Sequence, residues 1–224
     1  MDSKLSLGDF VAFKELFLPS KQTQFPHGAF DLLGDSLKTW LSNLLTKLGV
    51  GNQPLVLGKV HPQAIIEGRV YIAEGAVVEP TAYIQGPCYI GPGSEVRHGA
   101  YIRGNVYVGK DCVVGHTTEV KSSVFFDGAK AGHFAYVGDS ILGREVNLGA
   151  GTKLANLKLQ GNEVFYLDPT TRKKTASGLR KFGCVLGDHV QTGCNSVISP
   201  GSLLLPKTFV LPCAHVHGTL GLTK

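Results

Sequence analysis

The feature that most constrains this chain is a repeat of six residues between Ile66 and Val120. Stepping by six from Ile66 meets only Val or Ile at ten successive positions, and a mostly small residue stands two places before each. Six residues rotate an α-helix by about 600°, which would spread these side chains over three faces. Six is also a multiple of the two-residue period of a strand, so in strands the marked side chains all point the same way. The pattern therefore predicts short strands separated by turns and stacked as a solenoid.

The repeat continues beyond Val120 with two changes of phase and one break. The phase slips by one residue at Phe125 and again before Leu142, and the repeat returns at Leu186. Residues 158–183 break the pattern and are polar and basic, which indicates an inserted loop or hairpin. Such insertions leave a solenoid at one edge and often build its binding site. We expect three hexads to form one coil of a triangular β-helix, with coils about 4.8 Å apart.

Residues 28–48 follow a different period, because their apolar side chains recur at helical spacing before Gly49. This pattern predicts an amphipathic helix. We expect the helix to cap the first coil, because the open end of a solenoid exposes apolar surface and unpaired strand edges. A helix that binds a partner is the alternative. The expected parts of the chain are a helical N-terminal segment at 1–58, a β-helix at 59–157, an inserted basic loop at 158–183, and final coils with a tail at 184–224.

The composition argues against several classes of protein. The start, MDSKLSLGDFVAF, lacks the apolar core and cleavage site of a signal peptide, and no run of about 18 apolar residues predicts a membrane span. The 5 cysteines contain no CxxC pair, so free thiols in the reducing cytoplasm fit best. The net charge of +5 suits small anionic ligands. Without a dense Lys/Arg run interleaved with aromatics, we expect no binding of nucleic acid.

The segment from Gly115 to Asn156 is more specific than the repeat, because it contains the blocks EVKSS, KAGHFAYVGDS and VNLGAGTKLAN. With these blocks the chain resembles the C-terminal acetyltransferase domain of the GlmU-type glucosamine-1-phosphate acetyltransferases. It also resembles the corresponding domain of archaeal-type sugar-1-phosphate nucleotidylyltransferases. The resemblance spans residues 60–212, and the later block RKFGCVLGDHVQTGCNSVISPG is closer to the archaeal-type proteins.

The resemblance implies a left-handed parallel β-helix that forms a homotrimer. It implies transfer of acetyl from acetyl-CoA to the amino group of glucosamine-1-phosphate, at an active site between subunits and without a metal. His133 would be the general base, and Ala150 and Asn156 would lie near acetyl-CoA. The side chains implied to contact the sugar phosphate are Arg97, Lys121, Tyr136 and Asn147. In the insertion, Arg180 and Lys181 are candidates for holding the anionic substrate or the phosphates of CoA.

These residue types suit the implied reaction. A glucosamine amine attacks a thioester only when neutral, and a neutral imidazole can take its proton near pH 7. Lys121 and Arg97 supply positive charge for a phosphate, which Arg can bind through two hydrogen bonds. The oxyanion needs a donor, for which a backbone N–H in the turn Gly149–Gly151 is suitable. No covalent nucleophile is needed. Three cysteines fall at the small inward position of the repeat and are expected in the core: Cys88, Cys112 and Cys184.

The same residues also have structural interpretations. His133 could be an edge histidine, Tyr136 could cover a coil, the asparagines could stabilise turns, and the basic residues could be solvated. The chain departs from the bifunctional pattern where a lysine is replaced by Gly183 and where CNYDG reads ANLKL. These departures leave the sugar acceptor open. Nothing in the chain matches the Gly-rich nucleotide loop of a pyrophosphorylase, so we expect no such domain in it.

Two other functions remain open. His98, His116 and His133 are spaced by 18 and 17 residues, about one coil each, so we expect them to stack at one corner. Three His ligands can hold zinc, and with IRGN at Ile102–Asn105 the chain resembles the γ-class carbonic anhydrases. The pair of histidines five residues apart that such sites use is absent, because Gly138 follows His133 at that spacing. The other alternative is a non-catalytic trimeric scaffold or regulatory subunit.

Overall fold

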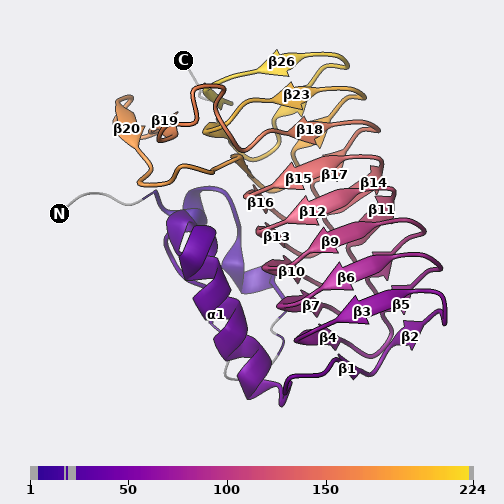
Figure 1. The fold of residues 1–224 in the computed structure, drawn as a ribbon. Helices are drawn as coiled ribbons and strands as arrows, with labels where there is room; N and C mark the ends of the chain where they lie inside the picture. Colours follow the sequence, from indigo (N-terminus) through magenta and orange to yellow (C-terminus); the bar gives the residue numbers. More distant parts are fainter. Residues whose placement is uncertain (1–4, 18, 20–23, 222–224) are drawn as a thin grey trace.

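A computed structural model describes residues 5–17, 19 and 24–221 of the protein, which folds as a left-handed β-helix (Figure 1). Its short strands form three parallel sheets, which make the three sides of a prism. Each coil contributes one strand to each side before the chain rises to the next coil. This architecture confirms the fold class that the six-residue repeat and the resemblance predict.

The three sheets are named here in the order in which the chain first reaches them. The first sheet consists of β1 (Leu55–Val56), β4 (Val70–Ile72), β7 (Cys88–Ile90), β10 (Val106–Val108), β13 (Ser123–Phe125), β16 (Ile141–Leu142), β21 (Cys184–Leu186), β24 (Ser202–Leu204) and β27 (Thr219–Leu220). The second sheet consists of β2 (Lys59–Val60), β5 (Val77–Val78), β8 (Glu95–Val96), β11 (Val113–His116), β14 (Lys130–His133), β17 (Asn147–Leu148), β22 (Gln191–Thr192) and β25 (Phe209–Val210). The third sheet consists of β3 (Ile65–Glu67), β6 (Tyr83–Gln85), β9 (Tyr101–Arg103), β12 (Glu119–Lys121), β15 (Tyr136–Gly138), β18 (Lys153–Leu154), β23 (Val197–Ile198) and β26 (His215–Val216).

The repeat positions form three inward ladders, one on each side of the prism. On the third sheet, Ile84 lies opposite Ile102, which in turn lies opposite Val120, and all three are fully buried. Fully burying one such side chain stabilises a fold by about 1.5–3 kcal/mol. The first predicted phase slip is confirmed, because Phe125 lies opposite Val108 although that coil is one residue short. The three cysteines predicted in the core are also fully buried: Cys88, Cys112 and Cys184.

The N-terminal segment covers the outer face of the first sheet, so the predicted capping of the first coil is wrong. It contains the turns η1 (Leu7–Asp9), η2 (Phe13–Glu15) and η3 (Ala29–Leu32), followed by helix α1 (Gly34–Lys47). The helix starts later than predicted, because Leu33 is extended. It runs alongside the prism (Figure 1), while Val56 and Leu57 of the first coil stay 41% and 52% exposed.

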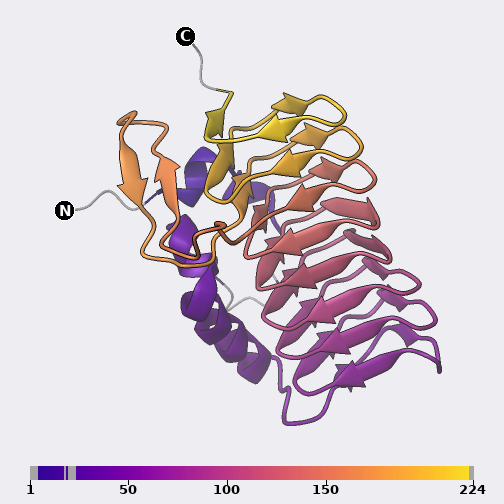
Figure 2. The same ribbon diagram turned by 45° about the horizontal axis from the view of Figure 1, so that its top comes forward.

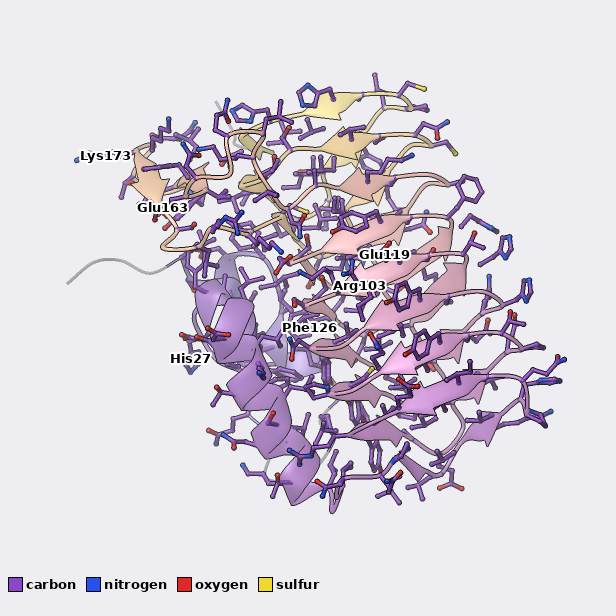
Figure 3. The ribbon with its side chains drawn as sticks, in the orientation of Figure 1. His27, Arg103, Glu119, Phe126, Glu163 and Lys173 are labelled. Atoms are coloured by element: carbon purple, nitrogen blue, oxygen red, sulfur yellow. The ribbon has the colours of Figure 1, made fainter. Side chains whose placement is uncertain are left out.

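The physical reason for this arrangement is the apolar outer face of the first sheet. Tyr89 and Tyr107 point outward from this sheet and are buried in one cluster with Leu37 and Leu41 of α1. Phe126 lies between the N-terminal segment and the sheet (Figure 3) and belongs to the same cluster. A face with this many apolar side chains gains more free energy from being covered than the small end of a coil does.

The insertion contains an antiparallel hairpin of β19 (Phe165–Leu167) and β20 (Lys174–Ala176). The hairpin projects from one side of the molecule (Figure 2), and Phe30 of the N-terminal segment packs 5.3 Å from the Tyr166 ring of the hairpin. At the other boundary, β1 already lies within the range 1–58 that the sequence assigned to the helical segment. Among the described residues, no helix is long and apolar enough to cross a bilayer.

Candidate functional site

The outer face of the third sheet is open, and its side chains are arranged in columns along the prism. In one column Tyr101, Glu119 and Tyr136 lie opposite one another in successive coils. In the neighbouring column Lys121 lies opposite Gly138. Arg103 and Glu119 form an ion pair of 2.6 Å on this face (Figure 3). The open face therefore carries charges, phenols and small residues, whereas the first sheet carries mostly covered apolar groups.

Asp139 is the centre of a polar cluster at one edge of this face. Its carboxylate lies 3.2 Å from the Lys121 ammonium and accepts a hydrogen bond from the Asn156 amide. The Tyr136 hydroxyl donates to the Asn156 carbonyl oxygen at 3.3 Å. Only 6% of the Asp139 side chain is exposed, against 18% for Lys121. The structure therefore brings three predicted site residues together through an aspartate that the sequence analysis did not select.

The environment of Tyr136 keeps its hydroxyl protonated. Burial raises the pKa of Tyr136, and the nearby carboxylates of Glu119 and Asp139 raise it further. At neutral pH the phenol is therefore a hydrogen-bond donor, not an anion.

The backbone around Asp139 explains why the cluster forms at this point. Asp139 has a φ of +46°, a conformation that Asp adopts more readily than most residues. After the insertion the chain returns here, and Gly183 N–H donates to the Asp139 carbonyl at 2.8 Å. A Cβ at Gly183 would lie 2.1 Å from the Ser140 hydroxyl oxygen, so no side chain fits at this position. Packing therefore accounts for a glycine at this position.

His133 occupies the corner between the second and third sheets. The rings of His98 and His116 stack there with centroids 5.4 Å apart, and His116 lies opposite His133. All three histidines therefore occupy one corner, as predicted, and the parallel ring stack there joins His98 and His116. His133 is exposed, and among the residues the structure describes none forms a hydrogen bond with its imidazole.

The predicted turn Gly149–Gly151 lies directly beside His133 in the next coil. Gly151 N–H donates to the His133 carbonyl at 3.1 Å, and Gly149 N–H donates to the Thr192 carbonyl at 2.9 Å. In the described part of the chain, Ala150 is the one residue of this turn whose N–H has no hydrogen-bond partner. This N–H is therefore the group of the turn that remains available to a ligand.

The other predicted site residues do not join the Asp139 cluster. Arg97 forms an ion pair of 2.7 Å with Glu95 of the same chain segment. Asn147 is exposed on the outer face of the second sheet. In the insertion, Arg180 donates to the Gly161 carbonyl at 3.0 Å, and Lys181 is exposed.

The His column does not form a ready metal site. Among the described residues, no group of three or more His, Cys, Asp or Glu side chains could hold a metal ion. Parallel stacking explains this result, since stacked rings direct their nitrogens along separate lines, whereas zinc ligands converge on one point.

The fold and the corner stack define the class of the protein, which is a hexapeptide-repeat, left-handed β-helix protein with one inserted hairpin. Residues 84–210 match the family described as "GMPPB C-terminal domain", and because this match covers more than half of the chain, the protein belongs to that family.

Named relatives confirm the resemblance to GlmU-type proteins. "Bifunctional protein GlmU" of Methanococcus maripaludis (strain C7) is 51% identical over 146 residues, which are 65% of this chain and 35% of that protein. "Bifunctional sugar-1-phosphate nucleotidylyltransferase/acetyltransferase" of Sulfurisphaera tokodaii is 40% identical over 99 residues, 44% of this chain and 24% of that protein. The match thus spans about a third or less of these relatives. Among solved structures, Arabidopsis UDP-N-acetylglucosamine acyltransferase aligns with a TM-score of 0.41 and 12% identity over 74% of this chain and 68% of that one.

Proposed function

We propose that the protein transfers acetyl from acetyl-CoA to the amino group of an amino-sugar-1-phosphate, with glucosamine-1-phosphate as the first candidate acceptor. The observation that carries this proposal is the exposed imidazole of His133 in the same coil as Tyr136, whose hydroxyl belongs to the Asp139 cluster. A base, a cation and a phenolic donor in adjacent coils are the groups that such a reaction requires.

In the proposed reaction the neutral amine of the sugar attacks the thioester carbonyl carbon, and the carbon–sulfur bond breaks. His133 takes the proton from the amine nitrogen and passes it to the departing CoA thiolate, so that the products are the amide and free CoA. Ala150 N–H donates to the oxyanion that forms on the carbonyl oxygen, and its position beside His133 supports this role. No metal or covalent intermediate takes part.

The acceptor's phosphate would lie near Lys121, whose ammonium is held at the edge of the open face by Asp139. Tyr136 and Asn156 would orient the sugar ring through hydrogen bonds. Arg97 and Asn147 lie outside this cluster in one chain, so they would reach the substrate from a neighbouring copy. This arrangement requires the homotrimer that the resemblance implies, and light scattering of the purified chain tests it.

Release of the CoA thiol tests the reaction. With acetyl-CoA, glucosamine-1-phosphate should release thiol, whereas N-acetylglucosamine-1-phosphate, whose amine is blocked, should not. Glucosamine without its phosphate should react poorly, and Lys121→Ala should raise the KM for the phosphorylated acceptor about tenfold while changing little for unphosphorylated glucosamine. A chain that releases no thiol with glucosamine-1-phosphate or galactosamine-1-phosphate would contradict the proposal.

One observation favours a non-catalytic scaffold as the second candidate. Lys121 and Asn156 both bind Asp139 within the chain, so neither needs a ligand to satisfy its polar groups. For a scaffold we expect a folded trimer that binds no acetyl-CoA by calorimetry and releases no thiol. Binding of acetyl-CoA without turnover would instead indicate an acceptor other than the two sugars tested.

A further inference from the structure

A cleft of about 740 Å³ lies between the β19–β20 hairpin and the final coils of the third sheet, and the acetyl-transfer proposal makes no use of it. Phe165 and Lys174 of the hairpin line one wall, Ser199 and His217 of the final coils line the other, and Lys158 lies in the segment that joins them. Its size is within the range of pockets that hold small ligands.

The two faces of the hairpin differ in exposure and composition. Phe165 and Leu167 face the cleft from β19, with Lys174 opposite Leu167 on β20. Tyr166 alternates to the other side and is 3% exposed, whereas Phe165 is 39% exposed. Because side chains alternate along a strand, one face of the hairpin is buried. The other face presents the Phe165 ring and the Lys174 ammonium to the cleft.

The hairpin is fixed to the coils, so the cleft is formed before any ligand binds. The Thr219 hydroxyl donates to the Leu167 carbonyl at 2.5 Å. Gly201, at a φ of +79°, faces the hairpin backbone so closely that a Cβ would lie 2.2 Å from the Phe165 carbonyl oxygen. A glycine at this turn lets the two walls approach.

The charge of the cleft is of one sign. The Lys158 and Lys174 ammonium groups lie 5.5 and 5.2 Å from the centroid of the Phe165 ring, and His217 adds a third basic group. None of the described residues that line the cleft is acidic. Two cations beside one exposed ring suit a ligand that has a planar group next to adjacent negative charges.

The cleft continues the open face that carries the Asp139 cluster. Ala155 lies in the column of Lys121 and Gly138, one coil further along, and Ser199 and His217 follow in the next two coils. Small side chains therefore form the floor between Lys121 and the cleft, and a ligand in the cleft would lie on the same face as the acceptor.

We propose that this cleft binds a nucleoside diphosphate, with the base against Phe165 and the phosphates between Lys158 and Lys174. This site stands on the hairpin geometry and does not depend on acetyl transfer. CoA and nucleotide sugars both contain a nucleoside diphosphate group. The preferred base, adenine or uracil, therefore indicates which of the two compounds the cleft binds.

Calorimetric titration of the full chain with ADP, UDP and inorganic pyrophosphate tests the proposal. We expect one of the two nucleotides to bind at least ten times more tightly than pyrophosphate, because the base adds stacking on Phe165. A preference for ADP indicates CoA as the source, and a preference for UDP indicates a nucleotide sugar. No binding of either nucleotide at millimolar concentration, or equally tight binding of pyrophosphate, would overturn the proposal.

Two charge-reversal variants at neighbouring lysines, Lys174→Glu and Lys173→Glu, test whether the nucleotide binds in this cleft. Lys174→Glu should weaken the preferred nucleotide about tenfold or more, and Phe165→Leu should weaken it about tenfold while leaving pyrophosphate unchanged. Lys173→Glu makes the same change in charge at the next residue, at the outer end of the hairpin (Figure 3) and in the lining of the opposite cavity. It should change the affinity less than twofold, and equal effects of the two lysine variants would contradict the site. His133→Ala should leave nucleotide binding intact, which separates this test from the test of acetyl transfer.

Discussion

The first and third sheets carry similar tyrosine ladders on their outer faces, but only one ladder is covered. On the first sheet the rings of Tyr89 and Tyr107 stack 5.0 Å apart, and both are buried under the N-terminal segment. On the third sheet the rings of Tyr83 and Tyr101 stack 5.5 Å apart, and Tyr101 is 37% exposed. The interior ladders of the two sheets are equivalent, so the difference lies in what the outer positions contact.

This difference shows how one repeat produces both a structural face and a site. On the first sheet the outward residues above Tyr107 are Val124 and Ile141, which complete an apolar surface. On the third sheet the outward residues above Tyr101 are Glu119 and Tyr136, which stay accessible to polar ligands. The inward ladder therefore maintains the fold, while the outward columns determine which face is covered and which can bind.

The largest difference in stability between the two faces is expected when a covered tyrosine is truncated. Tyr107→Ala should lower the free energy of unfolding by about 3–5 kcal/mol, because it removes a fully buried ring from the apolar cluster between the N-terminal segment and the first sheet. Tyr101→Ala, the matched change on the open face, should cost less than about 1 kcal/mol. Chemical denaturation followed by circular dichroism measures both, and similar losses would show that the open face is as tightly packed as the covered one.

A conservative variant sharpens the same comparison. The Tyr107 hydroxyl is buried and has no hydrogen-bond partner among the described residues. Tyr107→Phe should therefore leave the stability within about 1 kcal/mol of wild type or raise it. A loss as large as that of Tyr107→Ala would reveal a partner for the hydroxyl.

Another prediction concerns the buried charge at the edge of the open face. Asp139→Asn should lower the free energy of unfolding by about 2–3 kcal/mol, because Lys121 loses its carboxylate while mostly buried. Asn accepts the same positive φ, so the backbone is not the cause. Asp111→Asn is the control, since Asp111 also has a positive φ but pairs with Lys110 while 61% exposed. It should change stability by less than about 0.5 kcal/mol in the same denaturation experiment.

The cysteines provide a further comparison, because buried and exposed thiols should differ in reactivity. Burial raises the pKa of the Cys112 and Cys184 thiols to about 12, and it raises the pKa of Cys88 as well, whereas Cys194 and Cys213 are exposed. At pH 8 an aromatic disulfide reagent should modify two thiols quickly, and all five only after unfolding. Rapid modification of all five in the folded chain would contradict a closed interior.

The same shifts give a pH dependence. An unfolded cysteine loses its proton near a pKa of about 8.5, while the buried thiols of the folded chain keep theirs up to about pH 12. The folded state therefore binds more protons in this window, and stability should fall as the pH rises above about 8.5. Denaturation midpoints at pH 8 and pH 10 measure the fall, which Cys184→Ala should reduce and Cys194→Ala should not.

The sequence predicted the interior well, because the period of six depends only on local alternation. Even the phase slip at Phe125 was visible in the chain and corresponds to a short coil. The cover of the first sheet was not predicted, although Tyr71, Tyr89 and Tyr107 recur at outward positions one coil apart and carried the signal. The period of six that predicts the fold is carried by the inward residues alone, so it does not indicate what covers the outward ones.

The site was predicted in part for a different physical reason. The motif gave Lys121, Tyr136 and Asn156, but their meeting point, Asp139, depends on a chain return at Gly183 after a long insertion. Contacts across such a sequence distance leave no local period. The ion pair of Arg97 with Glu95, two residues earlier, is a local contact, but the motif that predicted Arg97 as a phosphate ligand does not include Glu95.

The most direct test of the account compares two members of the histidine column. His133 and His98 lie at the same corner, two coils apart, but only His133 borders Ala150 and shares a coil with Tyr136. With acetyl-CoA and glucosamine-1-phosphate, His133→Ala should reduce thiol release about 100-fold or more, and His98→Ala less than threefold. Equal rates for His133→Ala and wild type would contradict the claim that the open third sheet and its corner form an acetyl-transfer site.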